Sequence, residues 1–158
     1  GLTNTLTYKG FSLEFQFNYQ YGNLVQDTWA SYYLGAGFNA AFNKIYRVLD
    51  RWQKPGDVTD IPKYIEGGNK SFQSFSTVYL SKGDFIRLRN VQLGYDLPKS
   101  LLSKIKVESA SFYVRGVNLW TWVGDKTLGW DPEQGVSSQT NLDVLIPKTI
   151  TFGVNLGF

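Results

Sequence analysis

The stretch that decides the fold is the last part of the chain, Lys148-Thr149-Ile150-Thr151-Phe152-Gly153-Val154-Asn155-Leu156-Gly157-Phe158. Apolar residues alternate in it with small or polar ones, and successive side chains of a β-strand point to opposite faces. The stretch therefore predicts a strand with one apolar face. Two kinds of protein fit this pattern equally well: a soluble β-sandwich, and a bacterial outer-membrane β-barrel. In a barrel, the terminal aromatic residue Phe158 would be the signal for the barrel-assembly machinery.

Further stretches alternate in the same way, at about 1–8, 11–21, 85–97 and 108–119. The clearest is 11–21, whose length suits a tilted strand that crosses a bilayer in about 9–11 residues. Lys9-Gly10 separates the first two strands and predicts a two-residue hairpin turn. On the membrane hypothesis the candidate lipid-facing residues are Phe11, Leu13, Phe15, Phe17, Val91, Leu93, Phe112, Val114, Ile150, Phe152, Val154 and Leu156.

In the strand at 85–97, the arginines Arg87 and Arg89 share the odd-numbered positions with apolar residues such as Val91 and Leu93. An unbroken alternation would therefore place both arginines on the apolar face. Two arrangements would avoid burying them in lipid. The arginines could lie at a rim above the hydrocarbon, or a β-bulge could reverse the alternation.

The connections between these strands alternate between short and long. The short ones cover 9–10 and 98–107, and the long ones cover 22–84 and 120–147. Short turns at one end and long loops at the other are typical of outer-membrane barrels, whose long loops are extracellular. A connection as long as 22–84 is usually functional. Apolar residues at helical spacing predict a short amphipathic helix within it, formed by Phe38, Phe42, Ile45, Tyr46, Leu49 and Trp52.

The composition argues against an enzyme. The chain of 158 residues has no Cys and no His, so neither a Cys–His nor a Ser–His nucleophile can form. Asp125, Asp131 and Glu133 fit no calcium-loop spacing, although a carboxylate pair for glycoside hydrolysis is defined only in space. The 16 basic and 13 acidic residues are scattered, so no nucleic-acid partner is indicated. We therefore expect no catalytic, cofactor-binding or metal-binding residues.

The number of expected strands points to a larger protein. Five strands cannot enclose a lumen, because the smallest membrane barrels use about eight. The two outer strands would also be left as unpaired edges. We therefore expect the remaining strands to come from the same polypeptide, of which these 158 residues would be one part.

Several short sequence motifs resemble the carboxyl-terminal region of the SusC/RagA family of TonB-linked outer-membrane proteins. They occur in that family's order and cover essentially the whole chain. The longest is Asp84-Phe85-Ile86-Arg87-Leu88-Arg89-Asn90-Val91-Gln92-Leu93-Gly94-Tyr95-Asp96-Leu97-Pro98. The others are Tyr8-Lys9-Gly10-Phe11, Arg51-Trp52, Pro55-Gly56-Asp57, Asp60-Ile61-Pro62, Gly116-Val117-Asn118-Leu119-Trp120, Asp131-Pro132-Glu133, Pro147-Lys148 and Gly153-Val154-Asn155-Leu156-Gly157-Phe158.

The resemblance implies an all-β fold: the last five or so strands of a transmembrane antiparallel barrel of about 22 strands from Bacteroidetes. The amino-terminal plug, the TonB-contacting segment and the earlier strands are absent from these residues. The resemblance also implies import of oligosaccharides or peptides across the outer membrane. The implied partners are TonB, a SusD-like surface lipoprotein and outer-membrane lipid.

The long connections hold candidate contacts for cargo or for the lipoprotein partner. Trp120, Trp122 and Trp130 could stack on sugar rings, or they could form an interfacial belt or a loop core. Arg51, Trp52 and Asp57 could contact cargo or the lipoprotein, or they could fold the loop onto itself. Two other functions stay open: a structural or accessory barrel subunit of another outer-membrane complex, and a soluble carbohydrate-binding β-sandwich.

Overall fold

The computed structural model describes residues 1–39, 41–69, 72, 74, 76–105, 107–133, 139–140 and 145–158. Parts of both expected long connections therefore lie outside the described residues. The chain forms two compact units. The strand unit comprises Gly1–Tyr21, Asp84–Gly124 and Leu145–Phe158, and the loop unit comprises Gly22–Gly83 and Asp125–Val144. Among the described residues, no helix has the length and apolar character needed to cross a membrane.

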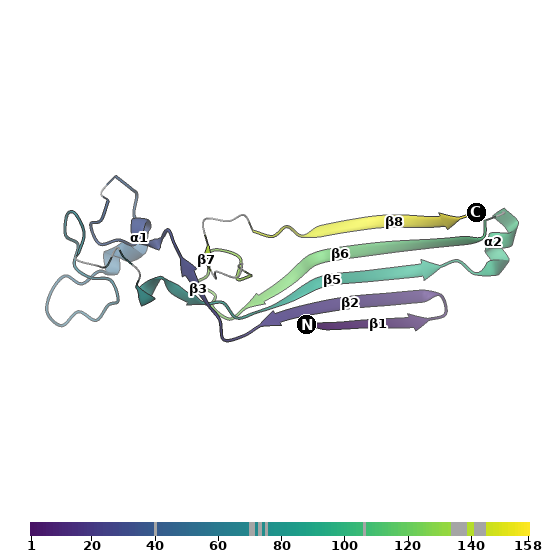
Figure 1. Cartoon of the computed structure of the whole chain (residues 1–158), viewed down its shortest axis with the longest axis horizontal. Coiled ribbons are helices and arrows are strands. Elements are labelled where there is room, and N and C mark those ends of the chain that lie inside the picture. The colour runs from purple at the N-terminus through teal and green to yellow at the C-terminus, as the bar shows by residue number, and fades with distance from the viewer. Residues whose placement is uncertain are drawn as a thin grey trace. The chain divides into compact units, whose positions relative to one another are not determined.

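The strand unit is one antiparallel sheet with the order β1-β2-β5-β6-β8, so strands that follow one another along this unit are also neighbours in space (Figure 1). Its strands are β1 (Leu2–Tyr8), β2 (Phe11–Gln20), β5 (Phe85–Asp96), β6 (Ser109–Val123) and β8 (Thr149–Gly157). The fold is thus built mostly of strands. β6 continues past the expected end at residue 119, which places Trp120 and Trp122 in a strand and not in a connection.

The turn between β1 and β2 has the backbone that the sequence predicts. Lys9 and Gly10 both have positive φ, 46° and 86°. Two central residues of positive φ are the mark of a type I′ turn, whose twist matches that of the flanking strands. Gly10 adopts this conformation without steric cost.

A β-bulge interrupts the sheet at Arg89. The pairing with β2 passes from Asn90 to Leu88, and the pairing with β6 shifts at the same place. Beyond the bulge, Leu88 and Ile86 take over the face that Val91 and Leu93 occupy below it. Arg87 therefore moves to the opposite face, opposite Asn18 and Thr121. Of the two arrangements open for the arginines, the bulge is the one observed.

The short connection after β5 holds a helix that the alternation did not predict, α2 (Lys99–Ile105). Pro98 starts it by offering its carbonyl oxygen to the backbone N–H groups of Leu101 and Leu102. Leu102 is buried, whereas Leu101 is about half exposed.

The loop unit has a small sheet of its own, ordered β4-β3-β7, and a separate core. Its strands are β3 (Leu24–Asp27), β4 (Leu80–Lys82) and β7 (Gln139–Thr140). The helices are α1 (Ala30–Tyr33) and the 3-10 helices η1 (Tyr46–Asp50) and η2 (Thr77–Tyr79). The core consists of Ala30, Leu34, Val48, Ile61 and Tyr79, with Tyr33, Phe72 and Val78 packed against it.

The prediction of an amphipathic helix between Phe38 and Trp52 is wrong. Among the described residues of this stretch only η1 is helical, and Asn39 has a left-handed φ of 49°. The ammonium of Lys44 donates to the carbonyl oxygens of Tyr32, Phe38 and Asn39. In a continuous α-helix the Phe38 oxygen would accept the backbone N–H of Phe42, which here donates to the Asn39 oxygen instead. The supposed apolar stripe is not buried, since Tyr46 is 84% exposed.

Candidate membrane-facing surface and loop pocket

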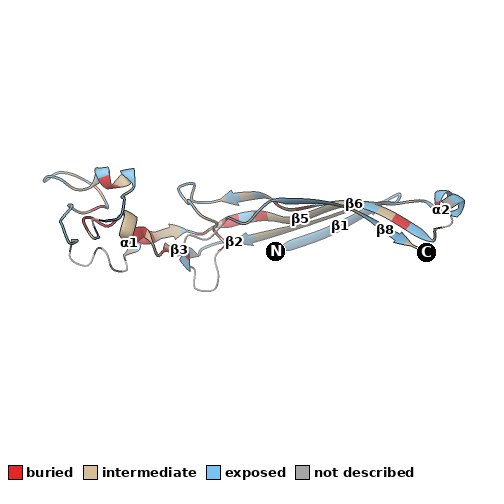
Figure 2. Cartoon of the chain, turned by 90° about the horizontal axis from the view of Figure 1, so that it is seen from above, coloured by how far each residue is buried: buried red, intermediate tan, exposed pale blue. Residues whose placement is uncertain are grey.

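The register of the sheet brings all twelve candidate lipid-facing residues onto one face, here called the apolar face. One cross-strand row runs through Leu13, Leu93, Val114 and Phe152. The next runs through Phe11, Tyr95, Phe112 and Val154. Much of this face is open, and Figure 2 shows β1 exposed along its length. A soluble monomer rarely exposes so continuous an apolar surface.

Aromatic residues end the apolar face at the bulge side of the sheet. Phe17, Leu88 and Trp120 form one row there, and Tyr19, Ile86 and Trp122 form the next. Trp120 is 49% exposed and Trp122 is 46% exposed. Because both indoles share the face of the apolar strand residues, their position favours an interfacial belt over a sugar-stacking platform.

The opposite face of the sheet, here called the polar face, carries hydrogen-bonded side chains. Asn90 Nδ2 donates to Glu14 Oε1 at 3.2 Å, and Arg115 Nε donates to Gln92 Oε1 at 2.8 Å. Glu14, Gln92 and Arg115 lie in one cross-strand row. The sheet therefore separates an apolar surface from a polar one, as a wall between lipid and water requires.

Two other candidates are placed without a partner that would reveal their role. Phe158 follows β8 and is 85% exposed, so its part in assembly stays a prediction. Trp130 lies in the loop unit and is half-buried. Among the described residues its indole N–H has no hydrogen-bond acceptor.

The loop unit contains a hollow of about 780 Å³ beside η1, here called the η1 pocket. Arg51 and Trp52, two of the predicted contacts, both line it. Asp57 does not, because its carboxylate accepts hydrogen bonds from the backbone N–H groups of Gln53 and Lys54, each at 2.9 Å. The full lining is Lys44, Ile45, Tyr46, Val48, Leu49, Arg51, Trp52, Gln53, Lys63 and Tyr64.

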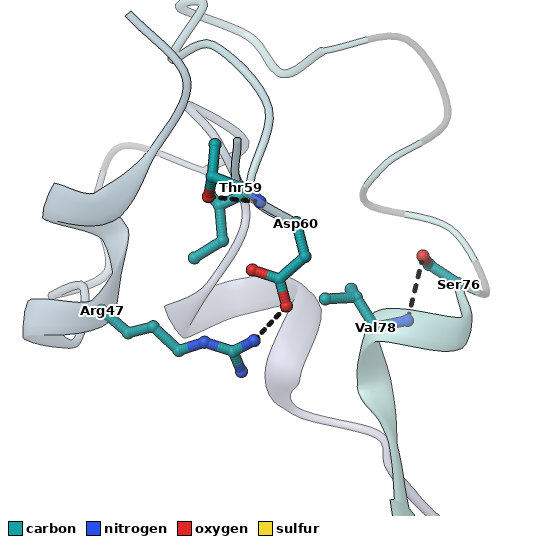
Figure 3. Close-up of polar contacts among 6 residues, drawn as sticks. Arg47, Thr59, Asp60, Ser76 and Val78 are labelled. Carbon is teal, nitrogen blue, oxygen red and sulfur yellow. Dashed lines mark hydrogen bonds and ion pairs between the residues drawn. The ribbon is translucent and has the colours of Figure 1, made fainter. Parts of the chain in front are cut away.

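Contacts between distant segments hold the pocket walls. Arg47 of η1 forms an ion pair with Asp60, as Figure 3 shows. The backbone N–H of Trp52 donates to the carbonyl oxygen of Ile61 at 2.9 Å. Ile61 and Val48 belong to the core of the loop unit. The sequence analysis named Arg51 and Trp52 as candidates but did not name Lys63 and Tyr64, because only folding brings these segments together.

Burial perturbs three ionisable groups of the loop unit. Desolvation lowers the pKa of Lys44. It raises the pKa of Tyr79 from 10.0 to about 12, and the Tyr79 hydroxyl donates to the carbonyl oxygen of Phe72. Desolvation also raises the pKa of Asp27, although hydrogen bonds from the backbone of Trp29 and Ala30 oppose it. These groups hold backbone segments in place through hydrogen bonds.

The remaining acidic candidates stabilise turns. Asp125 Oδ1 accepts from the Thr127 hydroxyl at 2.6 Å and from the Thr127 backbone N–H at 2.9 Å, which lowers the pKa of Asp125. Asp131 accepts from the backbone N–H of Glu133 at 2.9 Å. Within the described ranges, no three acidic side chains gather into a group that could hold a metal ion.

The strand unit is an antiparallel sheet with one apolar and one polar face, an arrangement that the walls of outer-membrane β-barrels share. No family model matches the chain. Among curated proteins, it is 29% identical to TonB-dependent receptor P26 of Formosa agariphila over all of its own length and 16% of that receptor. It is 34% identical to TonB-dependent receptor P39 of the same organism over 66% of its own length and 10% of that receptor.

The solved structures agree with the sequence relatives. The RagAB peptide importer in its closed-closed state superposes with a TM-score of 0.75 and 28% identity, over 99% of this chain and 17% of that one. The open-open state gives a TM-score of 0.76 and 29% identity. The chain thus spans about a sixth of the P26 receptor and of these importer chains. The resemblance to SusC/RagA proteins is confirmed, and the chain corresponds to part of a SusC/RagA-like TonB-dependent transporter.

Proposed function

We propose that the protein is a TonB-dependent transporter that imports oligosaccharides or peptides through the outer membrane, together with a SusD-like surface lipoprotein. The observation that carries this proposal is the similarity of the whole chain to a TonB-dependent receptor and to a peptide importer. Closure into a barrel of about 22 strands is part of the proposal.

In this proposal the strand unit is a passive part of the barrel wall. The apolar face contacts lipid, and the polar face, with Glu14 and Arg115, lines the lumen or contacts the plug. With the short connections in the periplasm, the loop unit is extracellular and helps to form the substrate cavity. β8 then runs toward the periplasm, and Phe158 follows its end there.

Fractionation and uptake test the proposal with the full-length protein. We expect it in the outer-membrane fraction, extracted only by detergent, and bound to a surface lipoprotein encoded beside it. Deleting its gene, or the segment that contacts TonB, should abolish uptake of one class of oligosaccharide or peptide. Normal uptake of every such cargo after gene deletion would contradict a transport function and would favour an accessory barrel.

A further inference from the structure

The charges around the η1 pocket are of one sign. Lys44, Arg51 and Lys63 line it, and the described residues of its lining include no carboxylate. Its volume of about 780 Å³ lies in the range of small-molecule sites. A hollow with several cations and no acid attracts a ligand that carries carboxylate or sulfate groups.

Two of the three cations are available to such a ligand. The ammonium of Lys44 is used by three backbone carbonyl oxygens, so it contributes potential and not a direct contact. Among the described residues the Arg51 guanidinium makes one long hydrogen bond, from Nη1 to the Val48 carbonyl oxygen at 3.5 Å, which leaves its other N–H groups available. Across the described ranges, the Lys63 ammonium has no hydrogen-bond or ion-pair partner.

Flat aromatic side chains complete the lining. They are the side chains of Tyr46, Trp52 and Tyr64, and within the described part of the chain none of the three contacts another aromatic ring. Such rings combine an apolar face with a polar tip. The C–H face of a sugar ring packs on the apolar face, while the sugar hydroxyls reach the polar tips.

A second hollow, of about 680 Å³, adjoins the first. Trp52 and Lys63 line both hollows, so one ring and one cation lie between them. Asp60 lines the second hollow, and its carboxylate forms an ion pair with Arg47 (Figure 3). Two adjoining hollows suit consecutive units of a chain-like ligand better than a single small molecule.

The backbone of the η1 pocket favours a sugar over a peptide. Extended peptides are commonly bound by pairing with an exposed strand edge. The lining residues lie in η1 and in irregular segments, 44–53 and 63–64, and none belongs to a strand. The rings and cations are therefore the groups left to recognise a ligand.

We propose that the η1 pocket binds an acidic oligosaccharide, with Trp52 stacking on a sugar ring and with Arg51 and Lys63 pairing with its carboxylate or sulfate groups. This inference rests on the proposed transport function, and it names the substrate class of that transporter. The hydrogen bond from the Trp52 backbone N–H to the carbonyl oxygen of Ile61 fixes the main chain at Trp52 beside the core, so little backbone order must be gained on binding.

The test is calorimetric titration of the full-length transporter in detergent with tetragalacturonate. Maltotetraose serves as the uncharged sugar and tetraglutamate as the acidic peptide. The double variant Arg51→Gln with Lys63→Gln removes both charges at nearly constant size. Lys54→Gln is the matched control, since Lys54 is exposed nearby but lines neither hollow.

We expect tetragalacturonate to bind more tightly than maltotetraose, and the double variant to weaken it at least about tenfold, because charge-assisted hydrogen bonds are lost. Lys54→Gln should leave its affinity within about twofold, since exposed charges outside a site contribute little. Trp52→Leu should weaken both sugars. If Trp52→Leu misfolds, the single variant Lys63→Gln still tests the pocket, because Lys63 is exposed and its substitution does not disturb the core.

Three results would overturn the inference. They are no binding of tetragalacturonate, binding of tetragalacturonate that the double variant leaves unchanged, or binding of tetraglutamate that is tighter than that of tetragalacturonate and is weakened equally by the double variant. Uptake in cells separates this failure from that of the proposed function. A transporter that imports another cargo but binds no tetragalacturonate refutes only the pocket assignment. A protein that binds it through Arg51 and Lys63, yet imports nothing, supports the pocket and refutes transport.

Discussion

Gly153 shows at the scale of a single residue how the polar face is packed. An added Cβ would lie 2.2 Å from Cζ of Tyr113, its direct partner on β6. The tyrosine ring thus covers the glycine. A glycine is needed at position 153 because the Tyr113 ring occupies the space of a Cβ, and not because the backbone there requires glycine.

We predict that Gly153→Ala destabilises the full-length protein by about 1–3 kcal/mol, because the Tyr113 ring must move. In a Tyr113→Ala background the same substitution should cost much less. Urea unfolding in phospholipid vesicles measures the free energy of unfolding of the wild type, both single variants and the double variant. An equal cost in both backgrounds would show that the ring is not the obstacle.

Neighbouring residues on β2 test which face meets lipid. Phe15 lies on the apolar face and Gln16 on the polar face. If the assignment is right, Phe15→Arg costs roughly 2–4 kcal/mol when the residue lies near the bilayer midplane, as do Arg substitutions of Phe17, Phe152 or Val154. Gln16→Arg at nearly the same depth should cost far less. Similar unfolding free energies for Phe15→Arg and Gln16→Arg would refute the lipid-facing assignment.

At the scale of elements, the β1–β2 turn depends on two consecutive residues of positive φ. Gly10→Ala should cost about 1–2 kcal/mol, since a side chain is strained there. Its Cβ would also approach the carbonyl oxygen of Asp96 to 3.0 Å. Lys9→Asn should instead stabilise the turn by up to about 1 kcal/mol, because Asn tolerates this conformation. Unfolding experiments on both variants should give opposite signs.

The core of the loop unit should respond to high pH through Tyr79. Its pKa is raised to about 12, so the neutral form is favoured in the folded state. The stability it contributes is complete below pH 10 and is lost as the pH rises toward 12. Tyr79→Phe should cost about 1 kcal/mol near neutrality through the lost hydrogen bond. It should also remove the latest component of the tyrosinate absorbance titration, and an unchanged titration would contradict the assignment.

At the scale of the whole molecule, the proposed orientation places the loop unit outside the cell and α2 in the periplasm. The 158 residues contain no Cys, so a single cysteine here is a clean probe. Lys54→Cys and Ser100→Cys both lie at exposed positions. An impermeant maleimide should label Lys54→Cys on intact cells, but Ser100→Cys only after the outer membrane is opened. The reverse pattern would invert the proposed topology.

Much of the strand unit was predictable because its signal is local. Alternation with a period of two identifies a strand and its apolar face from neighbouring residues alone. The same rule failed where one residue breaks the period, and it did not detect strands of two to four residues in the loop unit. Helical spacing of apolar residues also predicted an amphipathic helix over 38–52, where Lys44 instead binds the carbonyl oxygens of Phe38 and Asn39.

The sequence by itself determined the five strands of the strand unit, the apolar character of one face of each, and the resemblance to SusC/RagA proteins. Only the tertiary structure decided the bulge at Arg89, the place of Trp120 and Trp122 in a strand, and the η1 pocket. The physical reason is how far apart in the chain the interacting residues lie. Side-chain alternation follows from bonded neighbours, whereas the pocket depends on contacts such as Arg47 with Asp60 and Trp52 with Ile61, which exist only after distant segments have packed.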